Sequence, residues 1–153
     1  MRVACVGSKQ LTPSQLDLCF RIGAYLARQG DVVVSGGAIG ADQAFAQGAA
    51  SVCPARVHLY LPWPSYERGQ VPPGAKVYVG PDDHPEDLRL AQLHPRWAHI
   101  KDSVRLLMLR NAHIVRTSGC VIAYPRLDEA HRWTGGTAHA LTVAKCLGRQ
   151  LRP

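Results

Sequence analysis

The chain has 153 residues, with 18 Lys and Arg against 11 Asp and Glu, which leaves a net charge of +7 when histidine is neutral. A chain of this length can bury roughly 68–70% of its unfolded surface, enough for one hydrophobic core without metals or disulfides. The apolar share of 46%, with 14 Gly and 11 Pro, excludes collagen-like repeats, coiled coils and disorder and leaves a compact enzyme or binding domain.

The N-terminal half alternates short apolar strands with helices. A buried strand is predicted at residues 2–7 (RVACVG). A helix follows to about Gln29, opened by a capping box at Thr12 and ended by Gly30. The next elements are a strand at 31–35 (DVVVS), a small-residue helix at 41–51 and a strand at 56–61 (RVHLYL).

The pattern changes after this third strand. Residues 62–87 contain six prolines and predict a loop-rich excursion with one short strand at 76–79. The remaining elements are expected to be helices at 85–93 and 98–112, a strand at 119–123 and a helix at 137–147. Continuous apolar strands alternating with helices predict the α/β class. We expect one Rossmann-like domain over 1–153, with a mainly parallel sheet covered by helices on both faces.

The cysteines and the N-terminus indicate where the protein resides. The five cysteines are odd in number, widely spaced and free of any Cys-x-x-Cys pair, so we expect neither a disulfide scaffold nor a metal site. The chain has no apolar signal region and no run of 18 apolar residues. A cytoplasmic protein without a membrane partner is therefore predicted.

The excess charge lies entirely in residues 94–153. This segment holds ten Lys and Arg against three acids, whereas residues 1–93 hold eight of each. Such asymmetry favours an anionic partner, namely nucleic acid, a nucleotide or a phosphorylated metabolite. The alternative is a solvated Arg-rich surface, because no run of like charges is dense.

The most specific motif is the glycine-rich turn at residues 35–42 (SGGAIGAD), between a strand and a helix. Glycines allow a tight turn and close ligand approach, and free N–H groups at a helix start attract an anion. The turn is neither a Walker A loop nor a Gly-x-Gly-x-x-Gly motif. A purely structural turn is the alternative, and Asp42 either favours the helix dipole or accepts a hydrogen bond from a ribose hydroxyl.

Two further small-residue turns are expected at the same sheet edge, because the carboxyl ends of parallel strands gather there. They are residues 7–9 (GSK), which add an ammonium group, and residues 135–137 (GGT), which open the last helix. Four aromatic residues in predicted loops near this edge are candidates for stacking on a base, namely Trp63, Tyr66, Tyr124 and Trp133.

These motifs resemble a known superfamily. Residues 33–42 are similar to the Ser-Gly-Gly-Ala-x-Gly-x-Asp signature of DNA-processing protein A (DprA/Smf). The 7–9 turn resembles a Gly-Ser-Arg-type first turn. The turn at 61–63, the pair Arg110-Asn111 and residues 136–139 (GTAH) are similar to YspA-type members of the SLOG superfamily, which also includes the LOG nucleotide phosphoribohydrolases.

The resemblance implies a domain that holds a nucleotide or nucleic-acid phosphate at the glycine turns. The binding positions expected from the turns and the resemblance together are Gly7, Ser8, Lys9, Ser35, Gly36, Gly37, Ala38, Gly40, Asp42, Arg110, Asn111, Gly135, Gly136 and Thr137. Members of the superfamily often pair, which implies a homodimer.

One departure bears on catalysis. The LOG enzymes carry Pro-Gly-Gly-x-Gly-Thr-x-x-Glu, and the position of that Glu is Ala140 here. We therefore expect no catalytic residue and no cofactor, and a non-catalytic domain that binds a nucleotide or nucleotide-derived ligand. The alternatives are sequence-independent binding of single-stranded DNA and an N-glycosidase in which His139 or Glu129 replaces the missing carboxylate.

Overall fold

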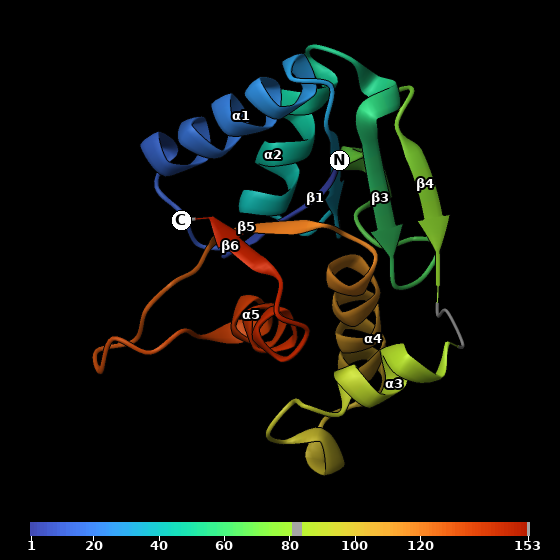
Figure 1. Ribbon diagram of the computed structural model, residues 1–153, viewed down its shortest axis with the longest axis vertical. Helices are drawn as coiled ribbons and strands as arrows, with labels where there is room; N and C mark the ends of the chain where they lie inside the picture. Colours follow the sequence, from blue (N-terminus) through green and yellow to red (C-terminus); the bar gives the residue numbers. More distant parts are fainter. Residues whose placement is uncertain (81–83, 153) are drawn as a thin grey trace.

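The computed structural model describes residues 1–80 and 84–152, which form a parallel six-stranded sheet in the order β4-β3-β2-β1-β5-β6 (Figure 1). The strands are β1 (Arg2–Gly7), β2 (Val32–Ser35), β3 (Val57–Leu61), β4 (Lys76–Val79), β5 (Cys120–Tyr124) and β6 (Gln150–Arg152). The helices are α1 (Pro13–Arg28), α2 (Ala41–Ala50), α3 (Pro85–Ala91), α4 (Asp102–Arg116) and α5 (Gly135–Cys146). The predicted α/β Rossmann-like class is confirmed.

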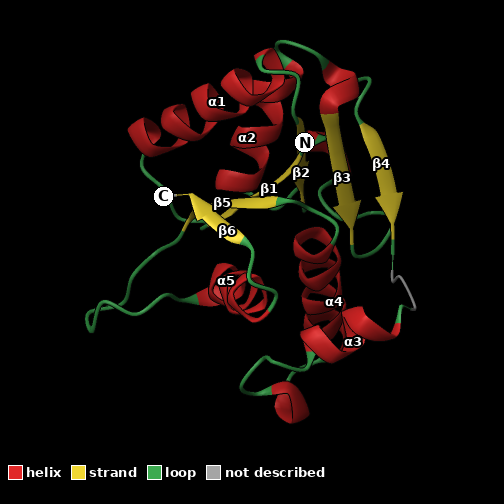
Figure 2. Cartoon of the chain, viewed as in Figure 1, coloured by secondary structure: helices red, strands yellow, loops and turns green. Residues whose placement is uncertain are grey.

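Helices cover both faces of the sheet, α1 and α2 on one face and α3, α4 and α5 on the other (Figure 2). Successive β1 side chains point to opposite faces, so Cys5 packs toward α1 and α2 while Val6 packs toward α4 and α5. The first core is centred on Phe45 and the second on Ile114, both fully buried. Burying a side chain of this size stabilises the fold by about 1.5–3 kcal/mol.

The elements differ from the sequence predictions mainly at α4 and β6, while α5 begins two residues earlier than predicted and α3 ends two residues earlier. The helix expected at 98–112 begins at Asp102 and continues to Arg116, because Ile114 and Val115 are buried in the second core. Residues 97–99 form a short 3-10 helix before it. Strand β6 was not predicted; its three residues pair with β5 at the edge of the sheet.

The strand order indicates where on the sheet a ligand can bind. The chain builds β1 to β4 outward in one direction and then returns to add β5 on the other side of β1. The carboxyl ends of β1 and β5 therefore flank the point where the strand order reverses, which is where open α/β sheets bind ligands. Among the described residues, none of the helices is long and apolar enough to cross a membrane.

Candidate functional site

A cleft of about 480 Å³ opens beyond the carboxyl ends of β1 and β5. This volume lies in the range of small-molecule sites, roughly 300–1,000 Å³. The cleft brings together many of the predicted binding residues, namely Gly7, Ser8, Lys9, Ala38, Asp42, Tyr66, Arg110, Asn111, Gly135, Gly136 and Thr137. The predicted residues that do not line it are Ser35, Gly36, Gly37, Gly40, Trp63, Tyr124 and Trp133.

The glycine-rich turn at 35–42 contributes only Ala38 and Asp42 to one wall of the cleft, and its polar side chains bond within the protein. Ser35 is fully buried, and its hydroxyl donates to the carbonyl of Cys5 at 2.6 Å. The Asp42 carboxylate is 5% exposed and accepts a hydrogen bond from the N–H of Gly7 at 3.1 Å. Burial raises the pKa of Asp42, opposed by Arg110 and by backbone N–H groups including that of Gly7. The carboxylate thus ties this turn to the first one.

The Arg110-Asn111 pair connects this wall to the start of α5 on the opposite side of the cleft. Arg110 donates from Nη1 to the carbonyl of Gly36 at 2.6 Å and from Nε to Oδ1 of Asn111 at 3.1 Å. Asn111 in turn donates from Nδ2 to the carbonyl of Gly136 at 3.3 Å. A Cβ at Gly36 would overlap the guanidinium, so glycine there lets Arg110 reach the backbone. The pair therefore fixes the spacing between two glycine turns.

The first turn of α5 presents backbone N–H groups to the cleft. Its N-cap, Thr134, makes no side-chain cap hydrogen bond to the helix, and the first turn contains no acidic residue. In the part of the chain that the structure describes, no acceptor bonds to the N–H groups of Gly136 or Thr137, which precede the first intrahelical bond. Such groups, at the positive end of a helix dipole, are chemically suited to bind an anion.

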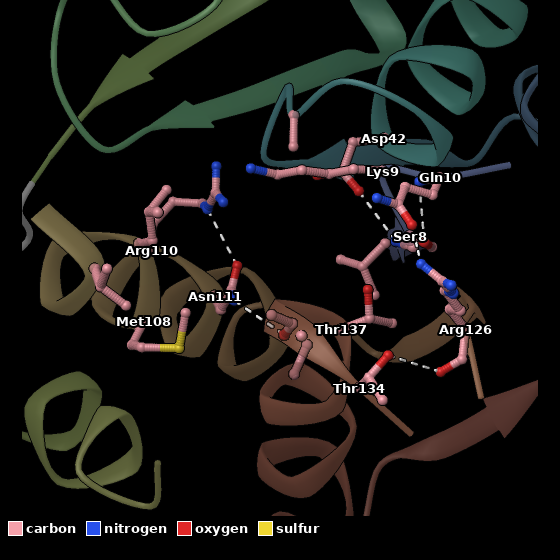
Figure 3. A pocket seen from close by; sticks show the side chains of 18 of the residues that line it. Ser8, Lys9, Gln10, Asp42, Met108, Arg110, Asn111, Arg126, Thr134 and Thr137 are labelled. Carbon is pink, nitrogen blue, oxygen red and sulfur yellow. Dashed lines mark hydrogen bonds between the residues drawn. The ribbon is translucent and has the colours of Figure 1, made fainter. Parts of the chain in front are cut away.

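Three cationic side chains border the cleft, namely Lys9, Arg110 and Arg126. Lys9 and Arg110 reach over it from opposite sides, and Arg126 lies near Thr134 with its guanidinium hydrogen-bonded to Gln10 (Figure 3). Among the described lining residues, the only acid is Asp42, which is buried behind the turn. The cleft therefore carries a local excess of positive charge, which favours an anionic ligand.

The four aromatic candidates separate into two groups. Tyr66 lines the cleft beneath Arg110, whose guanidinium lies 5.4 Å from the ring centroid, and Trp63 supports Tyr66 edge-on at 5.2 Å. Tyr124 and Trp133 instead line a separate apolar groove beside β5 and β6. Of the four, only Tyr66 is thus placed to contact a ligand in the cleft.

An apolar side of the cleft was missed by the sequence analysis. It is formed by Val104, Leu107 and Met108 of α4, with His94 beyond them. The α4 stripe has the spacing of a core-facing helix, and that pattern does not distinguish a cleft wall from a core. The Nδ1 atom of His94 accepts a hydrogen bond from the N–H of Arg96 at 3.1 Å, so the neutral ring carries its proton on Nε2.

The residues weighed for catalysis have distinct positions. Ala140 lines the cleft, so the place of the LOG-type carboxylate is present but holds a methyl group. The His139 side chain is buried, and its Nε2 lies 3.2 Å from the carbonyl of Leu90. Burial lowers the pKa of His139 to about 4. Glu129 is exposed and does not line the cleft. In the described segments, no three His, Cys, Asp or Glu side chains gather as metal ligands.

Comparison with known proteins supports the sequence motifs. Residues 1–56 match the family model of DNA recombination-mediator protein A. No curated protein sequence matches the chain. DNA processing protein A from Helicobacter pylori, studied for its binding of single-stranded DNA, has a similar structure with 20% identity and a TM-score of 0.69 over 99% of this chain and 63% of that one.

Two other solved structures have the same fold. The molybdenum cofactor carrier protein MCP from Chlamydomonas reinhardtii has 15% identity and a TM-score of 0.62, over 98% of this chain and 74% of that one. DprA from Streptococcus pneumoniae has 19% identity and a TM-score of 0.63, over 98% of this chain and 48% of that one. The chain thus spans less than two thirds of either DprA chain. The expected resemblance to DprA is thus present in residues 1–56, and the solved structures share the Rossmann-like fold of the whole chain.

Proposed function

We propose that the chain binds a nucleotide or a nucleotide-derived phosphorylated ligand in the cleft beyond β1 and β5. The observation that carries this proposal is the first turn of α5, whose N–H groups face the cleft without acceptors among the described residues. A phosphate at this turn would receive backbone hydrogen bonds and lie among the cations Lys9, Arg110 and Arg126.

The remaining space of the cleft suits the rest of a nucleotide. The apolar side formed by Val104, Leu107 and Met108 offers a surface for a base, and Tyr66 adds an aromatic ring. His94, with its Nε2 proton, could donate a hydrogen bond to an acceptor on that base. The polar and apolar sides of the cleft therefore match the two ends of a nucleoside phosphate.

Binding rather than hydrolysis is the activity that these residues support. Cleavage of an N-glycosidic bond needs a general acid or base near the sugar. Ala140 supplies none, and the Asp42 carboxylate is held by backbone N–H groups. His139 is buried with its Nε2 next to the carbonyl of Leu90. Incubation with nucleoside monophosphates, followed by chromatography, is expected to leave them intact, and release of free base would overturn this assignment.

Isothermal titration with a panel of nucleoside mono-, di- and triphosphates tests the proposal. We expect saturable binding of at least one of them, weakened about tenfold or more in the double variant Lys9→Ala, Arg126→Ala. Arg28→Ala is the matched control, since this cation is exposed on α1 and does not line the cleft. Absence of binding at millimolar concentration, or equal weakening by Arg28→Ala, would refute the proposal.

Single-stranded DNA is the second candidate ligand. The similarity to DprA and the three cations of the cleft favour it, because phosphates of a strand bind cationic grooves and release counterions. Gel shifts with single-stranded oligonucleotides of unrelated sequences should then show binding that weakens steeply as the salt concentration rises. A salt-independent affinity, or no shift at low salt, would exclude this candidate.

A further inference from the structure

A second groove lies beside the cleft, on the other flank of α4. It has a volume of about 380 Å³ and opens between α4 and the carboxyl ends of β3 and β4. Its walls include Leu106 and Leu109 from the helix. Arg110 lines both this groove and the cleft, so the two spaces meet at its side chain.

Two tyrosines form an aromatic surface in the groove. Tyr60 of β3 and Tyr78 of β4 are paired in register, and their rings stack with centroids 4.7 Å apart and an interplanar angle of 14°. His113 of α4 lies against Tyr60 with ring centroids also 4.7 Å apart. Tyr78 lies on the edge strand and is 42% exposed, so its ring is accessible from the groove that it lines.

We propose that this groove holds a second base of the same ligand, so that the preferred ligand contains two bases joined through phosphate. The inference rests on the proposed function, which places the first base and a phosphate in the cleft. The connecting phosphate would lie at Arg110, and the second base would pack on the Tyr78 ring.

The arrangement of Arg110 supports a connection at this place. Its Nη1 and Nε atoms are bonded to the carbonyl of Gly36 and to Asn111, which fixes the guanidinium at the boundary between the two spaces. A guanidinium has five N–H donors, so two such bonds leave donors for a phosphate oxygen. Bases stack on aromatic side chains without regard to sequence, since every base has a π face.

The test compares ligands with one and two bases by isothermal titration. The probes are dAMP, the dinucleotide pdApdA and NAD⁺, which separates a 3′–5′ linkage, as in DNA, from the 5′–5′ linkage of a dinucleotide cofactor. We expect one of the two-base ligands to bind about tenfold more tightly than dAMP. Tyr78→Ala should remove this advantage and leave dAMP binding unchanged, and Tyr78→Phe should retain it. The control is Tyr25→Ala on α1, an exposed tyrosine on the opposite face.

A second measurement keeps the test independent of the folding of the variants. A dinucleotide with 5-iododeoxyuridine at one position should, on irradiation, cross-link to Tyr78 in the unmodified protein, as mapped by mass spectrometry. The second base site would be refuted if dAMP and both two-base ligands bound with equal affinity. It would also be refuted if Tyr78→Ala bound the two-base ligand as tightly as the parent protein does. Either result would leave the proposed function intact. Failure of these three ligands and of the whole panel of nucleoside phosphates to bind would refute both.

Discussion

Replacing Gly136 by alanine separates a binding role of the α5 turn from a structural one. Gly136 has no positive φ, and a Cβ there would meet only Asn111 Nδ2 at 3.6 Å and Met108 Cε at 3.9 Å, which are ordinary contact distances. Alanine also favours a helix over glycine by up to about 1 kcal/mol. The melting temperature of Gly136→Ala should therefore stay the same or rise by up to about 4 °C.

Ligand binding should respond in the opposite direction. Asn111 and Met108 both line the cleft, so the new methyl group would occupy space next to the N–H groups of the α5 turn. We expect the affinity for a nucleotide to fall at least tenfold, which corresponds to about 1.4 kcal/mol. Isothermal titration measures the affinity and differential scanning calorimetry the stability. Gly69→Ala is the control, since its Cβ would meet no atom within 4 Å and Gly69 lies outside the cleft. Nucleotide binding by Gly136→Ala equal to that of the parent would refute the assignment of the phosphate to this turn.

Two buried aspartates should affect stability in opposite pH ranges. Asp87 is fully buried and accepts hydrogen bonds from Arg116 at 2.5 Å and His113 at 2.9 Å, so Asp87→Asn should lower the free energy of unfolding by about 3–5 kcal/mol in urea titrations at pH 7. Asp17→Asn, which breaks an exposed pair, should cost less than about 1 kcal/mol, and similar losses for the two would contradict the buried-pair argument. Because burial raises the pKa of Asp42, its stabilising contribution is present below the unfolded pKa, about 3.9, and is lost as pH rises through the folded pKa. In Asp42→Asn this pH-dependent loss of stability should be absent. If the unfolding free energies of the variant and the parent changed equally with pH between 4 and 7, the role assigned to Asp42 would be refuted. Burial alone would raise the pKa of Asp87, but the bonds from Arg116 and His113 outweigh it and lower the pKa. The contribution of Asp87 to stability is therefore present above its unfolded pKa, about 3.9, and is lost as pH falls through the lower folded pKa.

The sequence was sufficient to predict that the segments 7–9 and 135–137 lie together at the carboxyl edge of the sheet. This success has a physical basis, since continuous apolar strands fix a parallel sheet and the carboxyl ends of parallel strands meet at one edge. The direction of a side chain within a turn was not predictable in the same way. The Asp42 carboxylate turns inward to bond the N–H of Gly7, and this depends on the backbone path of residues 35–42.

Which residues form the walls of the cleft could not be predicted from the sequence either. Leu107 and Met108 have the periodicity of a buried stripe, but periodicity defines a helix face and not what that face meets. The same limit applies to the loop aromatics. Tyr66 and Trp133 were equivalent candidates by composition, yet Tyr66 packs under Arg110 in the cleft while Trp133 lies against Lys145 in another groove.

The excess charge of residues 94–153 is only partly concentrated in the cleft. Arg110 and Arg126 line the cleft, whereas Arg116 bonds to Asp87 and Arg132 bonds to Asp128. With Lys9 from the other half of the chain, the cleft offers three cations. Single strands give a slope of about −0.7 per neutralised phosphate in a plot of log K against log salt concentration, so a strand bound by the cleft alone should give a slope near −2. A clearly steeper slope would mean that cations outside the cleft also contact the strand, and a slope near zero would mean that the charge of this half does not serve nucleic acid binding.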